Sequence, residues 1–349
     1  MRSASPLNIA IIGTGSIADQ HAAAIRDSDL SALKAVCSSS AQRAWEAAER
    51  FGVKAYSDYQ RMLQQEKDLD AVIIATASGQ HLEPTLACAR AGCHVISEKP
   101  LEIDLQRADR MIEACRQGDV HLACIFQNRY SDDFLKMKAA VQSGQLGRIV
   151  LGNAYIKWYR DHDYYAHSAW RGTLRGDGGA AFINQGIHTI DLLQHLLGPV
   201  NRVYAQTRTL VHDIEGEDVG AAILEFAGGA IGTIEASTAA YPGRPEQLAV
   251  YGQHGCIILE GGRLAEWVTR EGSQLLEPGP EAAASGASDP TAIGHALHRR
   301  QLDDIFQALL DGRPPEVSGE EGRKALQLVR AIYRSANTGE PVDMASVTR

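Results

Sequence analysis

The stretch Leu-Asn-Ile-Ala-Ile-Ile-Gly-Thr-Gly-Ser-Ile-Ala, residues 7–18, decides the fold of this chain. Its first half is an apolar run of the kind that forms a parallel strand buried on both faces. The second half reads Gly-x-Gly-x-x-Ala and leads into a helical pattern. Gly13 permits a tight turn, Gly15 lets the backbone approach a pyrophosphate, and Ala18 allows the helix to pack closely on the strand. The stretch therefore predicts a dinucleotide site formed by Gly13, Thr14, Gly15, Ser16 and Ile17.

Alternating strand and helix patterns continue outward from this stretch to about residue 126. Further strands are expected at 33–37, 69–75, 94–97 and 122–126, and helices at 41–51 and 82–91. Because parallel strands need crossover helices between them, the alternation predicts a doubly wound parallel sheet. We therefore expect an amino-terminal Rossmann domain, α/β in class, over residues 1–126.

The pattern changes after Gln127. A helix is expected at 134–143, a strand at 149–158 and a second helix at 181–197. Extended segments follow with no helix between them, at 202–211, 219–226, 230–237, 247–251 and 256–259. That succession predicts an open antiparallel sheet. A loop at 278–290 and helices at 295–310 and 320–336 complete a carboxyl-terminal domain expected to span 127–349.

Composition and charge exclude several classes of protein. The 349 residues hold 34 Lys and Arg against 43 Asp and Glu, a net charge of -9, and no basic run that would suit nucleic acid. No stretch approaches the roughly 20 apolar residues of a membrane span, and the first residues lack the apolar core of a signal peptide. None of the six cysteines belongs to a Cys-x-x-Cys pair. We therefore expect a reduced, cytoplasmic protein with no metal site.

The end of the second strand indicates which dinucleotide binds. NAD-binding versions of the glycine motif carry a carboxylate about 20 residues further on, where it accepts bonds from the ribose hydroxyls. Here the strand is followed by Ser38, Ser39 and Ser40, and then by Arg43. No carboxylate is present to repel a 2′-phosphate, and Ser38, Ser39 and Arg43 offer donors to one. This favours NADP(H), with NAD(H) as the alternative; in that case the serines cap a helix and Arg43 is a solvated charge.

Motifs along the whole chain resemble those of the Gfo/Idh/MocA oxidoreductase family. They are Thr-Ala-Ser-Gly-Gln-His at 76–81, Ser-Glu-Lys-Pro at 97–100, Gln-Asn-Arg at 127–129, Trp-Arg-Gly-Thr at 170–173, Gly-Gly at 178–179, Asn-Gln-Gly-Ile-His at 184–188, and Asp191. Glu-Lys-Pro combined with Asn-x-x-x-His is much more specific than the glycine motif alone. The resemblance implies a Rossmann domain followed by an α/β domain with a large, open, mostly antiparallel sheet. In the family the exposed face of that sheet commonly forms a homodimer or homotetramer contact.

The resemblance also implies which residues meet the cofactor and the substrate. Cofactor contacts are expected from Thr76, Ser78, His81, Glu98, Lys99, Gln127, Asn128, Trp170 and Arg171. Substrate contacts are expected from Lys99, Asn184 and His188. The loop at 157–165 adds Tyr159 and Arg160, an aromatic and polar mixture that suits a carbohydrate, although such a loop also suits a packed domain edge.

The implied chemistry is hydride transfer between a nicotinamide and a carbon that bears a hydroxyl or carbonyl oxygen. A proton must move to or from that oxygen, so the site needs an acid/base group of near-neutral pKa. Lys99 is the family's lysine, which serves as that group or polarises the oxygen. Many relatives carry Asp where this chain has Asn184. Asparagine cannot take a proton, so we expect Asn184 to hydrogen-bond a substrate hydroxyl and His188 to act as the acid/base.

The expected function is that of an NADP(H)-preferring oxidoreductase for a sugar, polyol or sugar derivative, similar to the NADP-dependent sugar reductases of the family. Two alternatives stay open on the sequence. The fold includes NAD-dependent glycosidases, which oxidise a sugar transiently, and non-catalytic regulators that bind a dinucleotide as a sensor. A carboxylate in place of Ser38 would fit the glycosidases better, and the presence of Lys99 and His188 together argues against a regulator.

Overall fold

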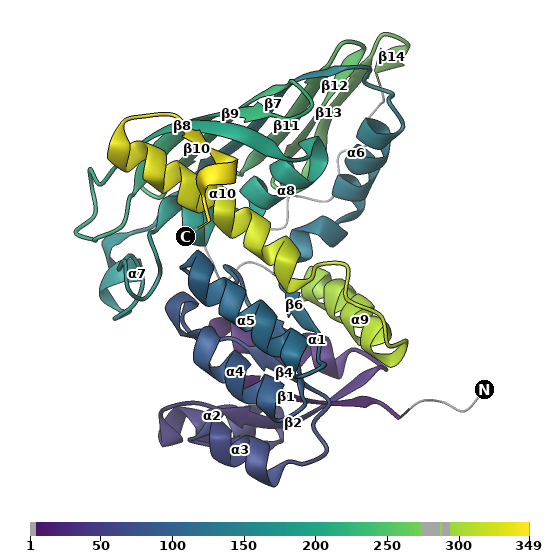
Figure 1. Ribbon diagram of the computed structural model, residues 1–349, viewed down its shortest axis with the longest axis vertical. Helices are drawn as coiled ribbons and strands as arrows, with labels where there is room; N and C mark the ends of the chain where they lie inside the picture. Colours follow the sequence, from purple (N-terminus) through teal and green to yellow (C-terminus); the bar gives the residue numbers. More distant parts are fainter. Residues whose placement is uncertain (1–4, 274–286, 288–293, 349) are drawn as a thin grey trace. The chain divides into compact units, whose positions relative to one another are not determined.

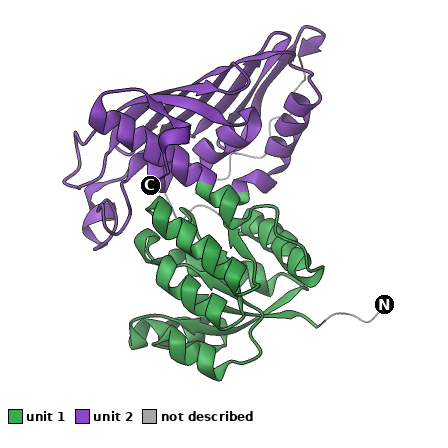
Figure 2. Cartoon of the chain, viewed as in Figure 1, with its two compact units in different colours: residues 1–127, 294–323 green, residues 128–293, 324–349 purple. Residues whose placement is uncertain are grey.

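The computed structural model describes residues 5–273, 287 and 294–348 (Figure 1). The chain divides into two compact units (Figure 2). The first comprises Met1–Gln127 and Gly294–Arg323, and the second Asn128–Ile293 and Lys324–Arg349. The organisation thus differs from a single cut at residue 127, because residues 294–323 return to the first unit. Within the described ranges, no helix combines the length and the apolar character that crossing a membrane requires.

The first unit is built on a six-stranded sheet with the strand order β3-β2-β1-β4-β5-β6. Its strands are β1 (Leu7–Ile12), β2 (Ser31–Cys37), β3 (Lys54–Tyr56), β4 (Ala71–Ile74), β5 (His94–Ser97) and β6 (Leu122–Cys124). Every pairing between neighbours is parallel. The predicted doubly wound sheet is therefore confirmed. The sequence pattern does not predict β3, because a three-residue strand is too short to show a period.

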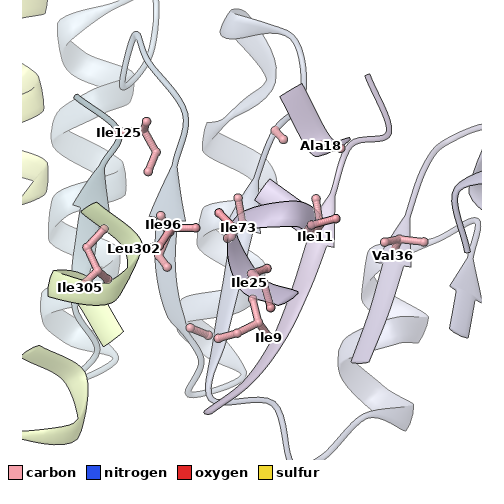
Figure 3. Close-up of a cluster of buried hydrophobic side chains, with 14 of the residues drawn as sticks. Ile9, Ile11, Ala18, Ile25, Val36, Ile73, Ile96, Ile125, Leu302 and Ile305 are labelled. Carbon is pink, nitrogen blue, oxygen red and sulfur yellow. The ribbon is translucent and has the colours of Figure 1, made fainter. Parts of the chain in front are cut away.

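Helices cover both faces of this sheet, since the strand order steps away from β1 in opposite directions and crossovers are right-handed. They are α1 (Ser16–Arg26), α2 (Ala41–Phe51), α3 (Tyr59–Gln65), α4 (Leu82–Arg90), α5 (Leu105–Gln117) and α9 (Ala296–Leu310), with a short 3₁₀ turn η1 (Ser78–Gln80). On one face, Ile9, Ile11 and Ile73 of the sheet belong to a buried cluster with Ala18 and Ile25 of α1 (Figure 3).

Helix α9 belongs to the first unit for two reasons. Its apolar stripe, including Leu302 and Ile305, is buried in the same cluster as the isoleucines of the sheet (Figure 3). Its Gln301 is fully buried beyond the last strand, where the side chain accepts from the Phe126 N–H (3.0 Å) and donates to Cys124 O (2.8 Å). One side chain thus satisfies backbone groups that an edge strand would otherwise leave unpaired.

The second unit contains a nine-stranded sheet in the order β14-β13-β12-β11-β7-β10-β9-β8-β15. Its strands are β7 (Ile149–Lys157), β8 (Val200–Arg208), β9 (Val219–Phe226), β10 (Ile231–Ser237), β11 (Gln247–Gly252), β12 (Gly255–Glu260), β13 (Arg263–Thr269), β14 (Gly272–Ser273) and β15 (Val342–Asp343). β7 and β10 pair in parallel, and the other neighbouring strands pair antiparallel. The predicted mostly antiparallel sheet is confirmed.

The remaining helical elements are η2 (Gln127–Tyr130), α6 (Asp132–Gln142), α7 (His162–Ala166), a π-helical turn η3 (Ala181–Gly186), α8 (Ile187–Leu197), α10 (Gly319–Thr338) and η5 (Met344–Ser346). Helix α8 packs on β7 and β11 and covers one face of the sheet. The strand expected at 202–211 ends earlier, at Arg208, because the buried Asp218 carboxylate accepts the N–H groups of Leu210, Val211 and His212 and turns the chain. The loop expected at 278–290 lies outside the described residues, Ala287 apart.

Candidate active site

The glycine loop follows β1 directly, and its two glycines differ in backbone conformation and in surroundings. Gly13 has φ = 110°, and a Cβ there would overlap the carbonyl group of Ala75 after β4. Gly15 is the N-cap of α1, has ordinary backbone geometry and has nothing within 4 Å of a Cβ position. Among the described residues no side chain caps the first turn of α1, so its first N–H groups and the positive end of the helix dipole are left for another partner. Gly13 is therefore needed for the fold, and Gly15 keeps an anion-binding position clear.

The serines after β2 divide between capping and exposure. Ser40 is the N-cap of α2 and accepts from the Arg43 N–H (3.4 Å), and Ser38 accepts from the Ser40 N–H at the same distance. The side chains of Ser39 and Arg43 are exposed. A serine thus caps the helix, while the exposed side chains of Ser39 and Arg43 are left accessible to solvent or to a ligand.

A buried histidine ties the loop after β4 to the loop after β5. His81 Nδ1 lies 3.0 Å from Pro100 O, and Nε2 lies 3.3 Å from Thr76 O. Ser78 is also buried, on the turn η1. Thr76, Ser78 and His81 are thereby gathered beside the Lys99–Pro100 peptide, whose bond is cis.

Glu98 is the buried anion at the end of β5. Its Oε1 accepts from His21 Nε2 of α1 (2.7 Å), and its Oε2 accepts from the Lys99 N–H (3.0 Å). Burial by itself would raise the pKa of Glu98, but the bond to His21 and nearby positive charge outweigh it and lower the pKa to about 2. His298 of α9 packs edge-on against His21, and burial lowers its pKa to about 4. Glu98 is thus a fixed negative charge next to the half-buried Lys99.

In the second unit, Asn184 lies in the π-helical turn and His188 in the first turn of α8. The helix expected at 181–197 is thus present, with a π-helical first part that runs directly into α8. Glu217 caps the start of this helix, because its buried carboxylate accepts the N–H groups of Ala180 (3.1 Å) and Phe182 (2.7 Å). Burial raises the pKa of Glu217, and Tyr333 donates to it as well. Single π turns of this kind occur frequently at functional sites.

Asp191, one helical turn beyond His188, orients the helix. Its two oxygens accept from Arg129 at 2.7 and 2.6 Å, and both side chains are buried. A bidentate pair of this kind fixes direction as well as distance. The Arg of the Gln-Asn-Arg motif thus anchors α8 to the start of the second unit, where Asn128 is half-buried.

The aromatic loop is internally bonded. Arg160 is buried and donates to the carbonyl oxygens of Tyr159 (2.8 Å) and Ala287 (3.0 Å) and to Gln185 Oε1 (2.7 Å). Tyr159 stays half-buried, edge-on to Tyr241. Arg160, expected to contact substrate, is therefore placed where it holds other side chains of the site.

Trp170 and Arg171 are half-buried on the turn that follows α7. The Arg171 guanidinium lies 4.2 Å from the centre of the Tyr164 ring and 5.8 Å from that of Trp170. Arg171 also lines a cavity of about 360 Å³ together with Tyr165, Thr173 and Glu215. Trp170 is therefore not a fully buried core residue, and Arg171 is not a fully solvated charge.

Two features fit a dinucleotide in the first unit. The uncapped start of α1 with the open position at Gly15 suits a pyrophosphate. Gln127 is buried, and its Oε1 has no hydrogen-bond partner among the described residues, as expected of a group that a ligand satisfies. By contrast, within the described residues no group of three or more His, Cys, Asp or Glu side chains could hold a metal ion.

Several residues of the site are missing from the sequence expectations: His21, Asp177, Gln185 and Glu217. His21 follows the glycine motif at 13–18, and Gln185 lies within the motif at 184–188. Their closeness to these motifs could have indicated that they belong to the site. Asp177 directly precedes the Gly-Gly pair at 178–179. Glu217 lies between two predicted strands with nothing in the sequence to connect it to residue 182.

Comparison with known proteins agrees with this architecture. Residues 7–126 match a family model described as "Oxidoreductase family, NAD-binding Rossmann fold", and residues 134–258 match the "GFO/IDH/MocA C-terminal domain". The WlbA dehydrogenase of Bordetella pertussis, solved with NADH and UDP-GlcNAcA, is 33% identical over 97% of this chain and 98% of that one, with a TM-score of 0.85. Myo-inositol 2-dehydrogenase of Thermotoga maritima is 29% identical over 98% of this chain and 99% of its own. D-apiose dehydrogenase of Paraburkholderia graminis is 29% identical over 97% and 90%.

The contrast between the two glycines gives a paired prediction. Gly13→Ala should lower the melting temperature, because the new Cβ would overlap the Ala75 carbonyl at a positive φ. Gly15→Ala should melt like the wild type but weaken dinucleotide binding by about tenfold or more, because the methyl group stands where the pyrophosphate approaches. Differential scanning fluorimetry and fluorescence titration with NADPH would measure the two effects. Equal behaviour of the two variants would contradict this division of roles.

Proposed function

Because this chain belongs to the Gfo/Idh/MocA family of oxidoreductases, we propose that it is an NADP(H)-preferring enzyme for a sugar, polyol or sugar derivative. It would transfer a hydride between the nicotinamide and a hydroxyl or carbonyl carbon. The observation that carries the proposal is the anchored Glu98–Lys99 segment, which holds an ionised carboxylate and a half-buried lysine next to a dinucleotide loop. Relatives named as inositol, apiose and glucoside dehydrogenases support this class over the glycosidase and regulator alternatives.

The residues that would hold the cofactor are those of the glycine loop, the serine–arginine segment and the loops after β4 and β5. When bound, the nicotinamide supplies or accepts the hydride. The backbone of residues 13–17 would bind the pyrophosphate, and Thr76, Ser78 and Glu98 would line the way toward Lys99. Gln127 Oε1, which lacks a protein partner among the described residues, would accept a hydrogen bond from the cofactor. Asn128, Trp170 and Arg171 would also contact the cofactor, as the family resemblance implies.

Lys99 and His188 would handle the proton. A cationic Lys99 polarises the substrate oxygen, and His188 exchanges the proton that must accompany the hydride. Asn184 cannot take a proton and would bind a substrate hydroxyl. The substrate panel should include inositols, aldoses and nucleotide-linked sugars, because relatives with all three kinds of name or ligand match most of the chain.

Replacing either proton-handling residue tests this assignment. Lys99→Ala and His188→Ala should each lower kcat by about 10²-fold or more, since general acid/base catalysis contributes at least that much. Dinucleotide affinity should change little. Nicotinamide absorbance on the sugar panel gives the rate, and the exposed Lys67→Ala and His254→Ala variants serve as matched controls. A near-normal kcat in either test variant would remove that residue from the mechanism.

The cofactor preference has its own test. Arg43→Ala should raise the Kd for NADPH by about tenfold, the loss expected of a charge-assisted bond to phosphate, and leave the Kd for NADH nearly unchanged. Arg61→Ala, which removes an exposed arginine from the next helix, should affect neither. Equal losses for the two cofactors would contradict a contact between Arg43 and the 2′-phosphate.

We also propose that the open face of the nine-stranded sheet binds a second copy of this chain. Cross-strand register aligns Ile231, Leu151, Tyr251 and Val268 in one row, and residues in one row share a face. Ile231 is 53% exposed, and Ile223 of the neighbouring strand is 52% exposed. Exposed isoleucines on a sheet whose other face is covered by α8 support the proposal that this face contacts a protein partner.

The oligomer prediction is tested by charge insertion. Ile223→Lys with Ile231→Lys should convert a dimer or tetramer to a monomer in size-exclusion chromatography with light scattering, because a buried lysine without a partner opposes association. Leu210→Lys, at an apolar residue that is 71% exposed outside the sheet, should leave the mass unchanged. A wild-type chain that elutes at the monomer mass of 37.7 kDa would contradict the proposal.

A further inference from the structure

Four side chains of the second unit form a continuous hydrogen-bonded row, which we call the carboxamide relay: Arg160, Gln185, Asn184 and Asp177. Arg160 donates to Gln185 Oε1 (2.7 Å). Gln185 Nε2 donates to Asn184 Oδ1 (2.9 Å), and Asn184 Nδ2 donates to Asp177 Oδ1 (2.5 Å). All four side chains are buried. The row therefore runs from a buried cation through two amides to a buried carboxylate.

The charges at the two ends fix the orientation of both amides. An arginine can only donate, so Gln185 must turn its oxygen toward Arg160. An ionised aspartate can only accept, so Asn184 must turn its nitrogen toward Asp177. The middle bond then has its donor on Gln185 and its acceptor on Asn184, which is the direction found in the structure. Reversing either amide would oppose two donors or two acceptors in a buried place.

Asp177 also reaches the turn that carries Trp170 and Arg171. Its Oδ2 accepts from the Gly172 N–H (3.0 Å). One carboxylate thus joins that turn to the π-helical turn through two different oxygens. The Asp-Gly-Gly segment at 177–179 is therefore mechanically linked to Asn184, which the proposed function places at the substrate.

We infer that Asp177 is a positioning residue for this site: it holds the Asn184 carboxamide in one orientation for the substrate hydroxyl. The inference rests on the proposed function for the role of Asn184. A carboxylate at both positions would bring two anions into contact with no donor between them. Asparagine at 184 is the residue that an aspartate at 177 requires.

A reciprocal exchange of the two side chains tests this inference. In the double variant Asp177→Asn with Asn184→Asp, the carboxylate moved to position 184 can accept from Gln185 and from the amide nitrogen at position 177. The amide oxygen at position 177 can in turn accept from the Gly172 N–H. Every bond of the row is then available again, with the end of the relay shifted from one position to the other. Each single variant instead leaves a buried donor or acceptor opposed to its own kind. The exposed Asp213→Asn variant is the matched control.

The expected result is a loss in both single variants and recovery in the double variant. Asp177→Asn and Asn184→Asp should each lower kcat/KM by about 10- to 100-fold, which corresponds to one unpaired buried polar group. The double variant should return to within a few-fold of the wild type. Asn184→Asp alone should regain activity as the pH falls, because a proton shared by the two carboxyls restores the missing donor. The other titratable groups around the pair, which all variants share, are Arg160, Tyr164, Tyr165, His188, Glu217 and Tyr333.

Two outcomes would overturn the inference: wild-type kcat/KM in Asp177→Asn, or a double variant no better than Asn184→Asp. The thermal-unfolding cycle over the same four proteins separates this failure from that of the proposed function. If the wild type turns over no compound of the panel, the proposed function fails, and the cycle still tests the relay. Recovery of the melting temperature in the double variant supports the relay, whereas additive losses overturn it.

Discussion

The hydrogen bond between His21 and Glu98 is the interaction on which the first unit's site depends. Strands β1 and β5 are not neighbours, because β4 lies between them. His21 in the helix after β1 nevertheless reaches the carboxylate after β5, at 2.7 Å. A buried carboxylate without such a partner would be unstable as an anion. The pairing therefore fixes α1, which follows the glycine loop, and the Lys99 loop in one arrangement, and Glu98 in turn holds the Lys99 backbone.

In the second unit, three further buried carboxylates hold other parts of the chain in place. Glu217 holds the backbone at the start of the π turn, Asp191 holds α8 through Arg129, and Asp177 holds Asn184 and the turn at Gly172. Each is a buried carboxylate whose partners lie on a different segment of the chain. Buried polar side chains thus position the residues that are proposed to contact the substrate. Arg160, which is also buried, belongs to this supporting set.

The features that depend on short stretches of sequence were predicted correctly. The apolar run ending at Gly13 and the strand–helix alternation were sufficient for the parallel sheet, and strands with short turns for the second sheet. The return of α9 to the first unit was not predictable, because an amphipathic helix does not reveal which sheet its stripe covers. The contact of Glu217 with the start of the helix at 181–197 was not predictable either, because the two lie more than 30 residues apart in the chain. Motif resemblance named Asn184, whereas its hydrogen bond to Asp177 is seen only in the folded chain.

The central claim is hydride transfer between a nicotinamide and a sugar carbon, and isotope transfer tests it most directly. The enzyme would be incubated with NADPH deuterated at both C4 positions and with the keto forms of the sugar panel, and the products analysed by mass spectrometry. The account predicts an alcohol that carries one deuterium on the reduced carbon, in a reaction that requires Lys99. A product without deuterium, or no product while the dinucleotide remains tightly bound, would contradict it.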